Sequence, residues 1–393
     1  MPAGVAAPLG GRARRRAVFL LSAAVFLLAL GVNMHMTMNV NYLNDLLKAS
    51  SWQQGYLEAI RETCGILSFF IIAFLAGRSE PRIASAMVLM VGAGLMGYRW
   101  LTGVQQVILF SLVWSFGFHI WAPLSGSMQL ALSKKGHEGQ TLGTFGSTAA
   151  VGVLLSLGGV FLLTRYTGFG MRNIFLLGGS LTMLASIPLF LMPDIRARTA
   201  ARLPLSRAFG PRYRLYVMLE FLDGMRKQIF ILFAILALVK ERGVGVETIS
   251  LLFLINQVIN FFCAPLAGKL VDRVGERPVL TAYFGGLIAI NLLYASLTHV
   301  NALFCVLLAD NAIWMLRVAV PTYANRIVLP GERTQLLAMG MTANHVGAVT
   351  LPLLGGAVYT AMGYQFTFYC GAAVALMSLG LVQLVPSRNG ARA

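Results

Sequence analysis

Residues 14–42 read RRRAVFLLSAAVFLLALGVNMHMTMNVNY, a basic cluster followed by an unbroken apolar run and then by alternating polar and apolar side chains. The apolar run is long enough to enter about 30 Å of hydrocarbon as a helix. Taken alone, the alternation over 31–42 is typical of a half-buried strand, and its Met and His side chains are ligands that copper accepts. As the continuation of a membrane helix, the same residues place polar groups on two stripes (Asn33, Thr37, Asn41; His35, Asn39). A helix that is polar on two sides is enclosed or lines water, so we interpret this stretch as the polar end of a membrane helix.

The composition of the whole chain indicates a membrane protein. Of 393 residues, 57% are hydrophobic and 11% are charged, and the mean hydropathy is +0.73, whereas soluble domains carry roughly 25% charged residues. Backbone groups in lipid must hydrogen-bond to one another, which long apolar runs achieve as helices. We therefore predict an all-α polytopic membrane protein with twelve transmembrane helices, at residues 17–40, 53–76, 83–101, 104–131, 141–163, 171–192, 213–239, 248–267, 279–298, 301–328, 335–361 and 365–385.

The formal net charge of +17 is distributed as in a membrane protein rather than in a protein that binds nucleic acid. With both termini cytoplasmic, most Lys and Arg fall in the inner segments, and few fall in the outer loops (Lys48, Arg165, Arg172, Lys240, Arg242). This asymmetry follows the positive-inside rule. No cleavage-site pattern follows the first span, so we expect this span to be retained. The expected location is the plasma membrane, which in a prokaryote is the inner membrane.

The sequence indicates neither a metal centre nor an enzyme active site. The four cysteines fall inside predicted spans, without zinc spacing or a disulfide framework (Cys64, Cys263, Cys305, Cys370). Met34 and Met38, and likewise Met341 and His345, are four residues apart, which leaves copper transport as an alternative. The sequence contains no nucleophile elbow and no phosphate-binding glycine loop, and no cofactor is expected.

An internal duplication divides the chain. PLAGK at 265–269 echoes FLAGR at 74–78, an offset of 191 residues, and AMGYQFTFYCGA at 361–372 echoes GFGMRNIFLLGG at 168–179, an offset of 193. Secondary transporters are commonly built from such repeats. The predicted domains are a basic cytoplasmic tail at 1–16, a six-helix bundle at 17–193, a basic linker at 194–212, and a second six-helix bundle with a short tail at 213–393.

One loop resembles a family signature. GKLVDRVGERP at 268–278 is similar to the cytoplasmic loop signature of the major facilitator superfamily, and matches it at Gly268, Asp272, Arg273, Gly275 and Arg277. The span count, the central linker and the repeat agree with the same family. The resemblance implies two pseudo-symmetric six-helix bundles and a gating role for this loop. The first-half copy, GRSEPR at 77–82, is shorter and lacks the Asp-Arg pair on which an equivalent lock would depend.

The resemblance also implies a central cavity lined by spans 1, 4, 7 and 10, and each of these spans carries a basic residue. His35 on span 1 corresponds to Arg226 on span 7, at the offset of 191. On spans 4 and 10, His119 and Arg317 each lie four residues before a proline. Because a charge inside a membrane is costly, it marks a functional site, and the His side chains can titrate near neutral pH. The predicted site for an anionic substrate comprises His35, His119, Arg226, Arg317, Asn33 and Lys227.

The same charges also allow a structural interpretation. Glu220, Asp223, Arg226 and Lys227 are spaced to pair along one face of span 7. Carboxylates in a low-dielectric cavity can in turn bind protons. The candidates for proton coupling are Glu58, Glu62, Asp223 and Asp310.

The predicted function is therefore a secondary active transporter of the major facilitator type, not an enzyme. It is expected to move a small solute by alternating access, by proton coupling or exchange, and a small organic anion is favoured. The alternatives are proton-driven efflux of amphipathic or cationic compounds and copper transport. The expected partners are the solute, protons and the lipid bilayer, and the chain is expected to act as a monomer.

Overall fold

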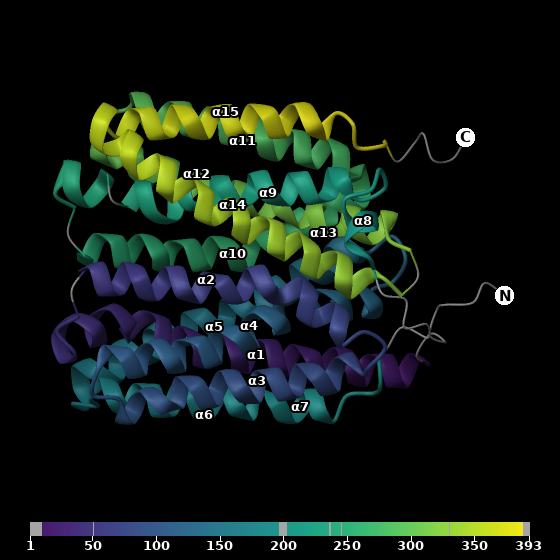
Figure 1. The fold of residues 1–393 in the computed structure, drawn as a ribbon, viewed down its shortest axis with the longest axis horizontal. Helices are drawn as coiled ribbons and strands as arrows, with labels where there is room; N and C mark the ends of the chain where they lie inside the picture. Colours follow the sequence, from purple (N-terminus) through teal and green to yellow (C-terminus); the bar gives the residue numbers. More distant parts are fainter. Residues whose placement is uncertain are drawn as a thin grey trace. The chain divides into compact units, whose positions relative to one another are not determined.

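The structure is a computed structural model, and it describes residues 10–49, 51–195, 203–235, 237–244, 246–329 and 331–387. All regular secondary structure in these ranges is helical (Figure 1). The predicted fold class is therefore confirmed. The alternation at residues 31–42 continues α1 (Gly11–Asn41) and is not a strand.

The chain divides into two compact units. Unit 1 consists of Met1–Ser133, Ser147–Leu203 and Leu329–Ala338, and unit 2 of Lys134–Gly146, Pro204–Val328 and Met339–Ala393. The division at Leu203 falls inside the predicted linker. Two short segments depart from the predicted halves, because the first turns of α5 belong to unit 2 and those of α14 belong to unit 1.

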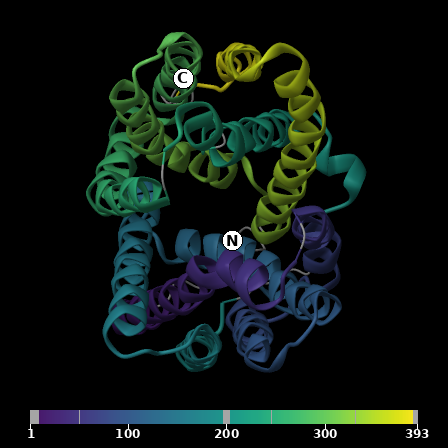
Figure 2. The same cartoon turned by 90° about the vertical axis from the view of Figure 1, so that its left-hand side faces the viewer.

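Unit 1 is built from helices whose apolar faces pack on one another. Its helices are α1, α2 (Ser51–Phe74), α3 (Glu80–Gly97), α4 (Val104–Leu132), most of α5 (Glu138–Tyr166), α6 (Met171–Leu184) and α7 (Ser186–Phe190), with a π turn, η1 (Tyr42–Leu46), and a 3-10 turn, η2 (Tyr98–Trp100). Helix α3 packs on α4 and α6, and α1 packs on α6 (Figure 2). A Cβ atom at Gly31 would clash with the carbonyl oxygen of Gly178, so glycine permits the close approach of α1 and α6.

Unit 2 contains three breaks in its helices. Its elements are α8 (Leu205–Ala208), α9 (Arg214–Gln228), η3 (Ile229–Ala234), η4 (Ala237–Glu241), α10 (Val246–Val274), α11 (Glu276–Ser296), α12 (Val300–Trp314), η5 (Met315–Val318), α13 (Ala319–Ile327), α14 (Arg333–Met362) and α15 (Tyr364–Val382). The π turns η3 and η4 follow α9, and the 3-10 turn η5 separates α12 from α13. Such breaks inside long helices often occur at functional sites.

Nine helical segments in the described ranges are long and apolar enough to cross a membrane. The predicted spans 53–76, 213–239 and 335–361 correspond to α2, to α9 with its π turns, and to α14, which are not among the nine. Helix α2 contains three charged residues within five positions, and α9 ends after 15 residues.

Candidate functional site

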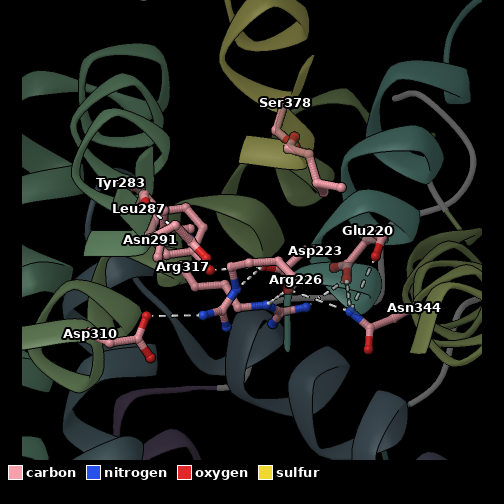
Figure 3. A network of polar contacts seen from close by, with 11 residues as sticks. Glu220, Asp223, Arg226, Tyr283, Leu287, Asn291, Asp310, Arg317, Asn344 and Ser378 are labelled. Atoms are coloured by element: carbon pink, nitrogen blue, oxygen red, sulfur yellow. Dashed lines mark hydrogen bonds and ion pairs between the residues drawn. The ribbon is translucent and has the colours of Figure 1, made fainter. Parts of the chain in front are cut away.

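A buried network of charged side chains occupies the interior of unit 2 (Figure 3). Helix α9 presents Glu220, Asp223 and Arg226 at three-residue intervals, which places them along one face of the helix. All three are buried, and Arg226 is 3% exposed. Burial of so many charges is tolerated only when the groups satisfy one another.

Arg317 links the two carboxylates of α9. It lies on η5, and its Nε donates to Oδ2 of Asp223 at 2.5 Å while its Nη2 donates to Oε2 of Glu220 at 2.6 Å. Two nitrogens of one planar guanidinium thus bind two separate carboxylates, a geometry that a lysine cannot reproduce. The side chain of Arg317 is 26% exposed, so it is the cation of this network that solvent reaches.

Arg226 forms the second pairing. Its Nη1 donates to Oδ1 of Asp310 on α12 at 3.2 Å, and its Nε lies 3.7 Å from Oδ1 of Asp223. The guanidinium carbons of Arg226 and Arg317 lie 4.4 and 5.3 Å from the ring centre of Trp314, within the range of a cation–π contact. Two arginines therefore share Asp223, and the ring of Trp314 contacts both guanidiniums.

Uncharged side chains hold the network in place. The hydroxyl of Tyr283 on α11 donates to Oδ1 of Asp223 at 2.7 Å, and Nδ2 of Asn344 on α14 lies 3.2 Å from the carbonyl oxygen of Glu220. A Cβ atom at Gly224 would clash with the carbonyl oxygen of Asn344, so this glycine lets α14 reach α9. The network thus joins four helices of unit 2. Sequence reasoning missed Tyr283 and Asn344, because neither residue stands out by charge or motif.

The acidic and basic side chains of this network are three carboxylates and two guanidiniums (Glu220, Asp223, Asp310; Arg226, Arg317). Together they carry one net negative charge when all are ionised. A single proton on one carboxylate would make this group of five neutral. Lys227, another predicted binding residue, is half-buried and follows Arg226 on α9.

The predicted histidines and Asn33 lie in unit 1. His35 is 0% exposed and contacts the rings of Tyr98, Trp114 and Phe175, with the closest centroid, that of Tyr98, at 4.5 Å. Neither of its ring nitrogens has a hydrogen-bond partner among the described residues. Asn33 Nδ2 donates to the carbonyl of its own helix four residues earlier, at 2.7 Å.

His119 and the predicted acidic residues complete the set. His119 Nδ1 donates to the backbone carbonyl of Ser115 at 2.7 Å, and its side chain is buried in α4. Glu62 is half-buried on α2, whereas the side chain of Glu58 lies outside the part of the structure that is described. Asp223 and Asp310 are the two proton-coupling candidates that the structure brings together, through Arg226.

The segment 268–278, for which the resemblance predicted a gating role, contacts the start of α5. The two carboxylate oxygens of Asp272, at the end of α10, accept hydrogen bonds from the backbone nitrogens of Gly139 at 2.8 Å and Gln140 at 2.7 Å. These amides have no partner within their own helix, and a carboxylate suits the positive end of the helix dipole. Gly268 allows the two backbones to touch, and Gly275 has a φ of 88°, which favours glycine. Arg273 is exposed, and Arg277 donates to the side chain of Gln383 at 3.2 Å.

A second contact between a carboxylate and the start of a helix was not predicted. Glu80, in the first turn of α3, accepts hydrogen bonds from the hydroxyls of Ser127 and Thr334, and these two hydroxyls lie 2.8 Å apart. Thr334 and Gly139 are each the second residue of their helices, α14 and α5. Glu80 precedes Asp272 by 192 positions, between the two repeat offsets, so the repeat itself contained a signal for this residue.

Comparisons with known proteins agree with this fold. The sequence model of the Major Facilitator Superfamily matches residues 216–392, and a search of curated protein sequences returned no match. Three solved structures are similar over nearly the whole chain. The human organic anion transporter MFSD10 has a TM-score of 0.77 at 14% identity, covering 94% of this chain and 99% of that one. The Escherichia coli fucose:proton symporter has a TM-score of 0.76 at 13% identity, covering 96% and 100% of the two chains. The proton:xylose symporter XylE has a TM-score of 0.77 at 14% identity, covering 96% and 97%.

At these identities the structural likeness shows the fold of the whole chain, and the sequence match is confined to residues 216–392. The predicted resemblance to the major facilitator superfamily is confirmed, by this sequence match and by the fold that the chain shares with transporters. The chain is accordingly a multi-pass membrane protein whose class moves small solutes and does not catalyse reactions.

Proposed function

We propose that this chain is a secondary transporter that moves a small organic anion together with a proton by alternating access. The observation that carries the proposal is the buried network of unit 2, in which two guanidiniums are held by three carboxylates. Guanidiniums recognise carboxylate and phosphate groups through parallel hydrogen bonds, which makes them suitable groups for an anionic solute.

Arg317 is the proposed anion-binding group. It is the more exposed of the two arginines, and both of its carboxylate partners come from α9. An incoming anion would compete with Glu220 and Asp223 for the same guanidinium nitrogens. A buried carboxylate that loses its cation is costly to keep ionised, so the displaced group takes up a proton. Binding of the anion and uptake of a proton are therefore linked by the pairing itself.

Arg226 would hold the rest of the network while this exchange takes place. It keeps Asp310 paired and lies close to the shared Asp223. The predicted binding residues His35, His119, Asn33 and Lys227 remain part of the proposal, as does the inner or plasma membrane location with both termini cytoplasmic. Among the structurally similar proteins, one is an organic anion transporter, which is the proposed class of solute, and two are proton-linked sugar symporters, which have the proposed coupling.

One observation favours a second function, the proton-driven efflux of cationic compounds. The five charged groups contain one more carboxylate than guanidinium, and Trp314 supplies an aromatic surface beside them. A cation would then bind a deprotonated carboxylate and be released when that carboxylate takes up a proton. The two functions can be distinguished at Arg317, because binding of an anion requires its guanidinium and binding of a cation does not.

The test uses purified protein in detergent. A ligand that binds only the folded state raises the melting temperature by mass action, so the protein is screened against small organic anions and amphipathic cations at pH 6 and pH 8. Anions are expected to stabilise the wild type, more strongly at pH 6, and to have no effect on Arg317→Gln. The matched control is Arg326→Gln, because Arg326 is 28% exposed and pairs with Glu276 at 3.2 Å in the same unit.

Two outcomes would contradict the proposal. Stabilisation by anions that persists in Arg317→Gln would exclude this arginine as the anion-binding group. Stabilisation by cations alone, retained in Arg317→Gln and stronger at pH 8, would support efflux instead.

A further inference from the structure

A group of carboxamide side chains lies beside the charged network in unit 2. Helix α10 carries Asn256, Gln257 and Asn260, and α12 carries Asn311, which follows Asp310 directly in the sequence. Nδ2 of Asn311 donates to Oδ1 of Asn260 at 2.8 Å and to the backbone carbonyl of Asn256 at 3.2 Å. Nδ2 of Asn260 in turn lies 3.3 Å from Oε1 of Gln257. These four residues are called the amide cluster below.

Part of the amide cluster is explained by helix packing. Carboxamides that hydrogen-bond across helices hold membrane helices together, and Asn311 does this between α12 and α10. Asn256 is different, because its side chain is 7% exposed and its Oδ1 has no hydrogen-bond partner among the described residues. A buried acceptor without a donor is destabilising. The Oδ1 of Asn256 therefore lowers the stability of the protein unless a ligand supplies a hydrogen-bond donor.

The position of Asn256 relates it to the anion site. Asp310 accepts from Arg226, and the next residue of α12, Asn311, binds the backbone of Asn256. Helix α10 also packs on η5, the turn that carries Arg317. A solute held at Arg317 by an anionic group would therefore have α10 beside it. The remaining members of the cluster, Gln257, Asn260 and Asn311, are partly exposed, so the cluster is not sealed from solvent.

We infer that the amide cluster is a hydroxyl-binding subsite, and that the transported anion is hydroxylated, as in a hydroxy acid or a sugar acid. A hydroxyl both donates and accepts a hydrogen bond, which matches carboxamides that present both kinds of group. The hydroxyl would donate to Oδ1 of Asn256. This inference rests on the proposed function for the anionic end of the solute, and adds the chemistry of the other end.

The experiment compares three six-carbon carboxylates with one uncharged six-carbon polyol. The stabilisation of detergent-purified protein by gluconate, hexanoate and 6-aminohexanoate is titrated at pH 6, with sorbitol as the uncharged polyol. We expect gluconate to bind about tenfold more tightly than hexanoate, the effect of one hydrogen bond to a buried acceptor. In Asn256→Leu, which keeps the size of the side chain but lacks the acceptor, the two affinities should become equal.

The outcomes of these titrations distinguish a failure of the hydroxyl subsite from a failure of the proposed anion transport. Equal binding of gluconate and hexanoate by the wild type, or no binding of either, would overturn the hydroxyl subsite, and tighter binding of 6-aminohexanoate would assign the cluster to an amine. Sorbitol binding as tightly as gluconate, unaffected by Arg317→Gln, would leave the subsite in place and refute the anion function. If Asn256→Leu does not fold, Asn256→Ala replaces it, and the comparison of probes on the wild type needs no variant.

Discussion

The pairing of Arg226 with Asp310 allows a test of whether these charges stabilise the fold or take part in transport. We consider Arg226→Gln, Asp310→Asn and the double variant. Arg226 is buried, and its Nη1 donates a hydrogen bond to Asp310, while Asp223 keeps Arg317 and Tyr283 when Arg226 is removed. Arg226→Gln leaves the buried Asp310 without its cation, and Asp310→Asn leaves Arg226 with Asp223 at 3.7 Å in place of two carboxylates. Loss of a buried partner typically costs about 3–5 kcal/mol.

The magnitudes distinguish a coupled pair from two independent sites. If the residues acted independently, the double variant would lose roughly 6–10 kcal/mol, the sum of the single losses. Because they pair, we expect the double variant to lose no more than either single variant, a coupling energy of about 3 kcal/mol or more. With roughly 2–4 °C of melting temperature per kcal/mol in units of this size, each single variant should melt roughly 6–20 °C lower, and the double variant should melt no lower than either single variant.

The assay is the melting temperature of the four proteins in one detergent, and the control is a second cycle. Arg326 and Glu276 are also 3.2 Å apart, but their side chains are 28% and 11% exposed, so their coupling should be about 1 kcal/mol or less. Additive losses in the Arg226 cycle, or equal coupling in the two cycles, would refute the reasoning. Anion-dependent stabilisation in the folded double variant then decides the role: we expect it to be weakened, because the site has lost a cation.

Three further predictions concern helix packing, the contact of Glu80 with α14, and the buried histidine. Gly224→Ala should lower the melting temperature strongly, because the new methyl group meets backbone of α14, whereas Gly285→Ala, which meets nothing within 4 Å, should not; similar values for both would refute the close approach. Thr334→Val removes a donor from the buried Glu80 carboxylate and should lower the free energy of unfolding by about 1–3 kcal/mol, with Thr334→Ser restoring it. His35→Phe should melt at the same or a higher temperature, since the ring lies among aromatic rings and its nitrogens lack partners in the described residues; a lower melting temperature would show that a nitrogen is bonded. The proposed binding role of His35 predicts that anions no longer stabilise this variant, and stabilisation that persists would exclude His35 from the substrate site.

Helix positions and the class of protein followed from local properties of the sequence. A membrane helix satisfies its own backbone, so its existence depends on the length and apolarity of one segment, as at residues 14–42. The repeat offsets and the loop at 268–278 then indicated the major facilitator superfamily. The line of Glu220, Asp223 and Arg226 on one face of α9 was equally local, because it requires only the helical period.

The partners of these charges were decided by the tertiary structure. Sequence spacing suggested that span 7 neutralises itself, but Arg317 comes from a 3-10 turn 94 positions after Asp223 and takes both Asp223 and Glu220. Asp310, Tyr283 and Asn344 likewise reach the network from three other helices. Pairing across helices depends on how the helices pack and where their backbones break, and neither property has a local period. The sequence by itself therefore determined which residues are charged within the membrane, and the fold determined which of them neutralise each other and which guanidinium remains accessible to a solute.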